Sequence, residues 1–232
     1  LLVEPARPRR IAAWSNAHWL VVATVCIGAF MGQLDASIVS LALPTLHEVF
    51  HASIGTVEWV ALAYLLTLVA TVVAVGRLAD MLGRKLLYTY GFGVFILGSA
   101  LCGLAPSLGF LVAARLLQAL GAAMLQANSV ALIVQAMPAD KLGRGIGVQG
   151  AAQAVGLAVG PAVGGLLISV GGWRLIFFIN VPAGLLGMLL GWILLPRSKY
   201  LQQRQPFDWL GAALFVPAVA APLVAISFGA DV

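Results

Sequence analysis

Charged residues are scarce in this sequence: Lys, Arg, Asp and Glu together make up 9% of its 232 residues. An average soluble domain has about 25%. Hydrophobic residues make up 62% of the chain, and its mean hydropathy is +1.03. A soluble domain of this size could not bury so much apolar surface. The composition therefore excludes a soluble enzyme, a disordered chain and a collagen-like fibre, and it predicts an all-α polytopic membrane protein.

Other chemical signals are also missing. The two cysteines, Cys26 and Cys102, lack metal-ligand spacing. The i,i+4 pair His47 and His51 has no firm third ligand, so we predict no metal site. The basic residues are scattered between apolar runs, which argues against nucleic acid as a partner. There is no phosphate-binding loop, so ATP-driven transport is unsupported, and we expect no cofactor and no enzymatic activity. There is no cleavable signal pattern either, so the first apolar run is kept as a membrane span.

What the sequence does have is a series of apolar runs, each long enough to cross a membrane, which takes about 20 residues. Seven transmembrane helices are predicted, at 19–43, 57–75, 86–104, 108–136, 145–170, 175–195 and 210–230. The predicted domains are a cytoplasmic tail (1–17), a six-helix domain (18–195), a polar linker (196–209) and a seventh helix (210–232). The start at Leu1 and the end just after the seventh run both suggest a fragment of a longer transporter.

Basic residues lie on alternate connections between these runs. They are Arg7, Arg9, Arg10, Arg77, Arg84, Lys85, Lys141, Arg144, Arg197, Lys199 and Arg204. The other connections hold only Arg174. Because positively charged connections stay in the cytoplasm, the pattern predicts a cytoplasmic N-terminus and a multi-pass location in the cell membrane.

The predicted connection between the second and third spans reads GRLADMLGRK. Its two glycines allow a sharp turn and close helix approach, and its aspartate can accept hydrogen bonds from either flanking arginine. A solvated loop that simply follows the positive-inside rule explains the same composition equally well. The candidate residues are Gly76, Arg77, Asp80, Gly83, Arg84 and Lys85.

Two charges lie inside apolar spans. Placing Asp35 there costs roughly 2.5–3.5 kcal/mol, so it should face the bundle interior or a water-filled cavity, where it can carry protons. Arg115 keeps its proton, so it could only tune a nearby carboxylate or organise water with Gln118. Helical rise places both charges in the outer half of the bilayer, where they can pair. A purely structural role is the alternative. Glu58 is either a second proton site or a helix-start acid stabilised by the helix dipole.

Glycines recur in the fifth predicted span. Gly156, Gly160 and Gly164 are spaced by four residues and form one smooth face for close helix packing. Pro161 removes a backbone hydrogen bond and can bend the helix, and Gly165 extends the motif. On physical grounds alone this is a packing face with a bend.

Together these stretches resemble the major facilitator superfamily. GRLADMLGRK is similar to the signature G-x-L-a-D-r-x-G-r-k, with Met81 in place of a basic residue. LDASIVSLALP resembles l-D-x-T-i-v-n-v-A-L-P of the multidrug branch, with Ser37 and Ser40 replacing Thr and Asn. RLLQALGAA resembles R-x-x-q-G-x-g-a-a, with Ala119 for glycine, and GLAVGPAVGG matches the antiporter signature g-x-x-x-G-P-x-x-G-G. GWRLIFFINVPAG and FDWLG resemble the starts of helices six and seven in the fourteen-helix branch.

The resemblance implies a drug:proton antiporter with fourteen helices, of which this chain would be the N-terminal six-helix bundle plus a linker helix. It implies proton coupling at Asp35, Arg115 and Gln118, a cytoplasmic latch at Asp80, and export rather than uptake. We expect a small amphipathic substrate and protons as ligands, the lipid bilayer and a C-terminal half as partners, and the proton gradient as the energy source. A transporter of a metabolite, amino acid or sugar, and a non-transporting membrane module, are the alternatives.

Overall fold

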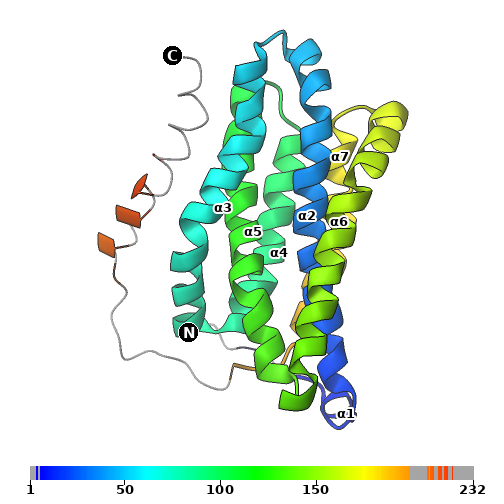
Figure 1. Cartoon of the computed structure of the whole chain (residues 1–232), viewed down its shortest axis with the longest axis vertical. Coiled ribbons are helices and arrows are strands. Elements are labelled where there is room, and N and C mark those ends of the chain that lie inside the picture. Colours follow the sequence, from blue (N-terminus) through cyan, green and yellow to red (C-terminus); the bar gives the residue numbers. More distant parts are fainter. Residues whose placement is uncertain are drawn as a thin grey trace.

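The computed structural model describes residues 4, 6–198, 208, 210, 211, 214, 215, 217, 218 and 221. Most of these residues are helical. The long helices are α2 (Ala17–Phe50), α3 (Ile54–Leu82), α4 (Arg84–Gly103), α5 (Leu108–Ala136), α6 (Leu142–Gly171) and α8 (Asn180–Leu194). The short ones are α1 (Arg9–Ala12), the 3₁₀ helix η1 (Ala139–Lys141) and α7 (Leu175–Phe178). The long helices run up and down along the long axis of the molecule (Figure 1).

Six segments of the described residues are long and apolar enough to cross a membrane. Four are α2, α3, α4 and α5, the fifth combines η1 with α6, and the sixth combines α7 with α8. These segments confirm the first six predicted spans. The predicted seventh helix (210–232) lies largely outside the described residues and stays a prediction.

One predicted connection is wrong. The sequence predicts a tight turn over residues 76–85, but α3 continues to Leu82 and α4 begins at Arg84. Only Gly83 separates the two helices, and its φ of +113° is a conformation that favours glycine. The Leu, Ala and Met residues before it are strong helix formers, so the backbone stays helical despite the loop-like charges. Gly76 is therefore helical, and a Cβ there would make only ordinary contact with Ala127.

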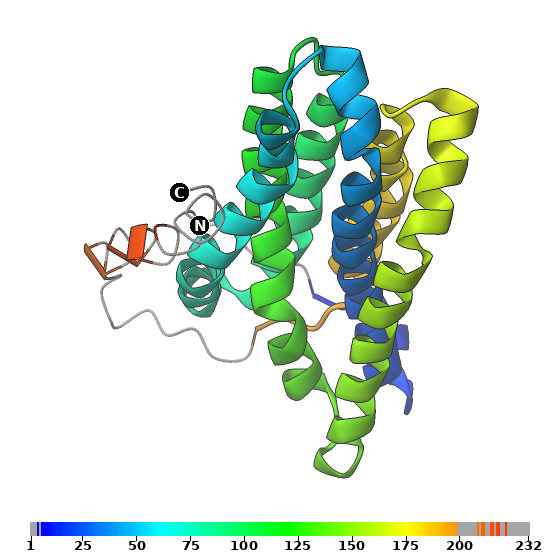
Figure 2. The ribbon, with the colours of Figure 1, turned by 45° about the horizontal axis from the view of Figure 1, so that its top comes forward.

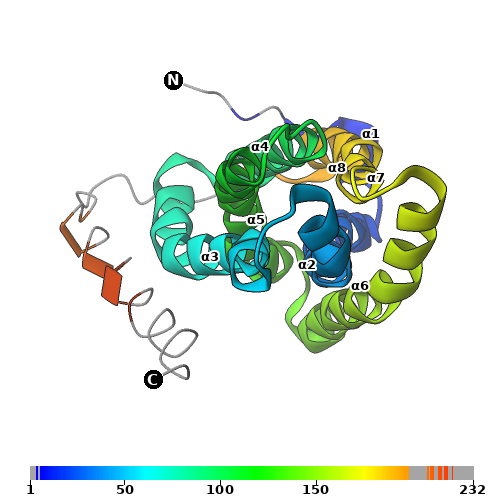
Figure 3. The ribbon, with the colours of Figure 1, turned by 90° about the horizontal axis from the view of Figure 1, so that it is seen from above.

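The bundle is held together by close approaches at small residues. Seen from above, α2 and α5 lie at its centre with α3, α4, α6 and α8 around them (Figure 3). The most extensive packing is between α4 and α5 and between α2 and α6. A Cβ at Gly98 of α4 would collide with the backbone of Gln118 on α5. Glycine therefore lets these backbones approach, as it does between membrane helices in general.

The predicted glycine face of the fifth span packs as expected. A side chain at Gly156 would collide with the Phe30 carbonyl of α2, and one at Gly160 would collide with Ser37. Gly164 is buried on the same face, whereas Gly165 is exposed beside it. Pro161 lies inside α6, which continues through it.

Apolar side chains form two clusters with a polar layer between them. One cluster includes Val21, Tyr88 and Met137, and the other includes Leu46, Val57 and Trp173. On α2, members of the first cluster lie in the half nearer α1 and members of the second in the half nearer α3. α2 itself runs from one end of the bundle to the other (Figures 1 and 2). The site described next lies where the two clusters meet.

Candidate functional site

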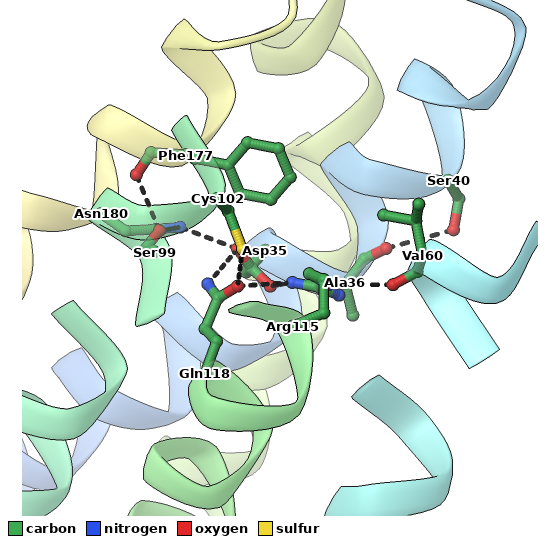
Figure 4. Close-up of polar contacts among 10 residues, drawn as sticks. All are labelled: Asp35, Ala36, Ser40, Val60, Ser99, Cys102, Arg115, Gln118, Phe177 and Asn180. Carbon is green, nitrogen blue, oxygen red and sulfur yellow. Dashed lines mark hydrogen bonds and ion pairs between the residues drawn. The ribbon is translucent and has the colours of Figure 1, made fainter. Parts of the chain in front are cut away.

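The two charges predicted inside the spans meet in the middle of the bundle. Arg115 Nη1 of α5 lies 2.6 Å from Asp35 Oδ2 of α2 (Figure 4). The side chains are 1% and 0% exposed. The structure therefore forms the direct pair that the sequence left open.

The other oxygen of the same carboxylate accepts two more hydrogen bonds. Gln118 Nε2 donates to Asp35 Oδ1 at 2.8 Å, and Asn180 Nδ2 donates to it at 2.7 Å. The donors come from α5 and α8 and the carboxylate comes from α2, so three helices meet at this site. A buried carboxylate is costly unless it is paired and hydrogen-bonded in this way. One cation and two amide donors therefore surround the Asp35 carboxylate.

Arg115 is fixed from several sides. Its Nε donates to the Val60 carbonyl of α3 at 3.0 Å, and its Nη1 also donates to Gln118 Oε1 at 2.8 Å. The guanidinium lies 4.0 Å from the ring centroid of Tyr64, within the range of a cation–π interaction. These contacts do not involve Asp35, so they hold the guanidinium of Arg115 in place independently of the protonation of that carboxylate.

Asn180 and Ser99 lie behind the pair and have no assigned role in the sequence analysis. Asn180 Nδ2 also donates to Ser99 Oγ at 3.0 Å, and Ser99 Oγ donates to the Phe177 carbonyl at 2.8 Å. Next to them, Cys102 Sγ contacts Gln118 Oε1 at 3.6 Å. The one available signal was that Asn180 is a lone amide within an apolar run.

A pocket lies beside this cluster. It has a volume of about 130 Å³ and is lined by residues of α2, α3 and α5. Its polar lining is uncharged and consists of Gln33, Tyr64, Gln126 and Ser129, while the rest is Gly, Ala and Leu. Tyr64 lines the pocket and also contacts Arg115, and its buried hydroxyl has no hydrogen-bond partner. One side chain thus separates the ion pair from a space suited to a small ligand.

A second acidic–basic pair lies at the end of the bundle that carries Gly83. Arg84 Nη2 is 2.7 Å from Asp80 Oδ1, and each side chain is 27% exposed. This confirms the predicted contact of Asp80 with one flanking arginine. Lys85 does not extend into solvent as a loop residue would: it is 1% exposed, and its Nζ donates to the Leu195 carbonyl at 2.7 Å.

The N-terminus of α4 next to this pair is capped by distant residues. Glu4 Oε1 accepts from the Leu86 amide at 3.3 Å and from Ser198 Oγ at 2.9 Å. Ser198 Oγ accepts from the Arg84 amide at 2.9 Å, and Ser198 N donates to Glu4 Oε2 at 2.6 Å. These contacts supply the cap that Gly83, which has no side chain, cannot provide.

Glu58 does not join the buried site. It is exposed on α3, which begins at Ile54, so the first turn has no acidic residue. The predicted helix-start position is therefore wrong. Within the described residues, no group of three or more His, Cys, Asp or Glu side chains could hold a metal ion.

Membrane-spanning helices around a buried ion pair and an uncharged pocket are features of a polytopic membrane transporter. The chain matches the sequence profile of the Major Facilitator Superfamily over residues 25–230. It belongs to this family, whose members are transporters of small molecules rather than enzymes.

Curated relatives are similar over most of the chain. It is 37% identical over 209 residues to the riboflavin transporter RibZ of Clostridioides difficile, covering 90% of this chain and 46% of that protein. It is 38% identical over 219 residues to the multidrug resistance protein Stp of Mycobacterium tuberculosis, covering 94% and 41%. It is 33% identical over 201 residues to a tetracenomycin C resistance and export protein of Streptomyces glaucescens, covering 87% and 37%. The chain thus spans less than half the length of these relatives.

Solved structures share the fold. A bacterial homolog of the human lysosomal transporter Spinster, in an inward-facing and occupied conformation, superposes with a TM-score of 0.71 at 20% sequence identity. The match covers 92% of this chain and 55% of that one. The arrangement of the six spans is therefore that of a major facilitator transporter.

Proposed function

We propose that this chain supplies the proton-coupling six-helix domain of an antiporter that exports small amphipathic molecules by alternating access. The observation that carries the proposal is the carboxylate of Asp35, which is buried between three helices and held by Arg115, Gln118 and Asn180. In membrane spans such a charge is rare and marks ion or proton pathways more often than packing.

The proposed mechanism uses the proton to change the contacts between helices. In the structure the anionic carboxylate of Asp35 draws α2, α5 and α8 together through its three donors. A proton taken up from outside neutralises that carboxylate and weakens its attraction to Arg115. Because a ligand shifts a conformational equilibrium only through its different affinity for the two states, the two transporter states must bind the proton unequally. The pair supplies that difference.

The pocket beside the pair supports an amphipathic substrate. Its lining offers hydrogen bonds from Gln33, Gln126 and Tyr64 between apolar surfaces, with no charged side chain. Two of the relatives named above are resistance or export proteins, which favours drug-like molecules. The relative named as a riboflavin transporter favours the second candidate, the transport of a metabolite.

The remaining motifs fit supporting roles. We infer that the partly exposed pair of Asp80 on α3 and Arg84 on α4, together with Arg77 on α3, latches the cytoplasmic side in one state of the transporter. Gly156, Gly160 and Gly164 keep α6 packed on α2, and we propose that the domain therefore moves as one body. From the positive connections we infer an N-terminus in the cytoplasm of a cell-membrane protein. We propose that the proton gradient is the energy source.

The experiment measures proton-driven transport in proteoliposomes made from the product of the complete reading frame. An imposed pH gradient should drive movement of riboflavin or ethidium, and Asp35→Asn should abolish it. The matched control is Asp140→Asn, which makes the same chemical change at an exposed site on η1 and should leave transport unchanged. Proton-driven transport at the wild-type rate in a folded Asp35→Asn protein contradicts the proposal.

Two further outcomes separate the alternatives. Movement of riboflavin without ethidium identifies a metabolite transporter. No transport of either compound by a folded wild-type protein supports a membrane module without transport activity. Measuring both compounds in the same vesicles therefore distinguishes drug export from the other two functions.

A further inference from the structure

A chain of hydrogen bonds runs from Asp35 to the sixth span. Asn180 Nδ2 donates to Asp35 Oδ1 at 2.7 Å and to Ser99 Oγ at 3.0 Å. Ser99 Oγ donates to the Phe177 carbonyl at 2.8 Å. Asn180 is 2% exposed and Ser99 is fully buried (Figure 4). This series of hydrogen bonds connects α2, α8, α4 and α7.

The hydrogen bonds in this chain have a direction. The amide nitrogen of Asn180 uses its two protons on Asp35 and Ser99, and the single hydroxyl proton of Ser99 is used on Phe177. A carboxylate only accepts hydrogen bonds, whereas a protonated carboxyl group also donates one. The direction seen here is therefore the one that a deprotonated Asp35 imposes.

The hydrogen-bonded series ends where the backbone ladder of the sixth span is interrupted. α7 ends at Phe178 and α8 begins at Asn180, and Ile179 between them keeps helical backbone angles (φ −61°, ψ −27°) and donates its N–H to the Leu175 carbonyl. The interruption is at the Phe178 carbonyl, because the residue four positions later is Pro182, which has no N–H. The neighbouring Phe177 carbonyl accepts a hydrogen bond from Ser99 of α4. The buried carboxylate is thus connected to the turn of the sixth span that lacks one backbone hydrogen bond.

We propose that Asn180 and Ser99 are positioning residues that transmit the protonation state of Asp35 to the turn of the sixth span before Pro182. When Asp35 gains a proton from solvent, the Asn180 amide turns over and its carbonyl oxygen accepts from both Asp35 and Ser99. The Ser99 hydroxyl then leaves the Phe177 carbonyl, and α7 loses its tie to α4. No proton moves along the chain, and only the directions of the hydrogen bonds invert.

This inference rests on the proposed function, because it needs Asp35 to take up a proton. Three other titratable or charged groups interact with the carboxylate: Arg115 of α5, Tyr64 of α3 and Cys102 of α4. None of these three groups lies on the sixth span. The variants that test the inference leave all three in place.

The experiment follows amide hydrogen exchange in residues 175–184, by mass spectrometry, on the chain in lipid nanodiscs over a range of pH. After correction for the intrinsic pH dependence of exchange, the wild type should exchange about three- to tenfold faster at pH values where Asp35 is protonated than at pH values where it is ionised. That factor corresponds to the loss of one typical hydrogen bond. In Ser99→Ala the fast rate should hold at every pH, because the tie is absent. Asp35→Asn, which cannot ionise, should do the same.

Thr24→Val is the matched control. Thr24 is a fully buried hydroxyl residue of α2 whose Oγ1 donates to the Leu20 carbonyl, so the change also removes a hydroxyl bonded to the backbone. It should keep the pH response of the wild type. Ser99→Ala removes a single oxygen atom, so it is the mildest of the test variants.

Infrared spectroscopy on the same samples separates failure of the inference from failure of the proposed function. The C=O stretching band of protonated carboxyl groups should contain a component that titrates in the wild type and is missing from Asp35→Asn, whose other carboxyl groups are unchanged. If that component titrates but exchange in Ser99→Ala still follows pH as in the wild type, the result contradicts the transmission through Asn180 and Ser99 and leaves Asp35 as the proton site. If the component does not titrate, both proposals fail.

Discussion

Two aspartate–arginine pairs in this domain have nearly the same length and very different surroundings. Asp35 and Arg115 are 2.6 Å apart and almost completely buried, whereas Asp80 and Arg84 are 2.7 Å apart and each 27% exposed. The first pair joins α2 and α5 and is 80 residues apart in sequence, and the second joins the last turn of α3 to the first residue of α4, four residues on. Distance alone therefore says little about what either pair contributes.

Burial decides the energy of each pair. An exposed pair typically contributes 0 to about 1 kcal/mol, because water and salt screen it. Removing one partner of a buried pair costs about 3–5 kcal/mol, because the other charge is left without compensation. The buried pair suits a switch that only a proton can open, and the exposed pair suits a latch that opens and closes readily.

The largest expected effect is that of Arg115→Leu. The variant leaves the Asp35 carboxylate buried with two amide donors and no cation, so the free energy of unfolding should fall by about 3–5 kcal/mol. Urea unfolding in detergent micelles measures the change. A loss below about 1 kcal/mol contradicts the comparison, because it means that the buried pair behaves like an exposed one.

Removing both charges should recover much of that loss. In the double variant Asp35→Leu, Arg115→Leu, no buried charge is left unpaired, so the double variant should be more stable than Arg115→Leu alone by about 2 kcal/mol. The two single variants and the double variant complete a mutant cycle in the same unfolding assay. Additive losses in this cycle contradict the assignment of the two residues to one pair.

Ser99→Ala tests how far the buried site extends. The variant removes the hydrogen bond to Phe177 and an acceptor for Asn180, so the free energy of unfolding should fall by about 1 kcal/mol. The same micelle assay detects this change, and Ser169→Ala on the exposed face of α6 serves as control. A change no larger than that of the control means that the site ends at Asn180.

Asp80→Asn should have the smallest effect. The exposed pair should contribute about 0.5 kcal/mol or less to the free energy of unfolding. About 1 M salt should remove even this difference, since it reduces the screening length to about 3 Å. A loss above about 2 kcal/mol that persists in high salt shows that this pair is more than an exposed latch.

The sequence reveals the charges of the site but not all of its partners. Asp35 and Arg115 stand out because each is an ion in an apolar run, and Gln118 follows Arg115 by one helical turn. Ser99 is not distinguishable from an ordinary polar residue of a span, and Asn180 stands out only as a lone amide in an apolar run. Their roles depend on contacts with Asp35 and Phe177, which are far from them in sequence.

The fold shows the same division. Hydropathy locates the first six spans because each must cross the same apolar thickness. It fails between α3 and α4, since Gly76 and the flanking charges have the composition of a loop although the backbone is helical up to Leu82. The burial of Lys85 could not be predicted either, because its acceptor is the Leu195 carbonyl of another span.

The cap on α4 also constrains the order in which the domain can be completed. The chain emerges from the ribosome from its N-terminus, so Glu4 is available long before Arg84, whereas Ser198 follows only after every span of the bundle. Until then the Arg84 amide lacks the Ser198 hydroxyl that it contacts in the folded domain. The cap on α4 is therefore completed late in biosynthesis. The contact between Glu4 and Ser198 can form only after all six spans have been synthesised.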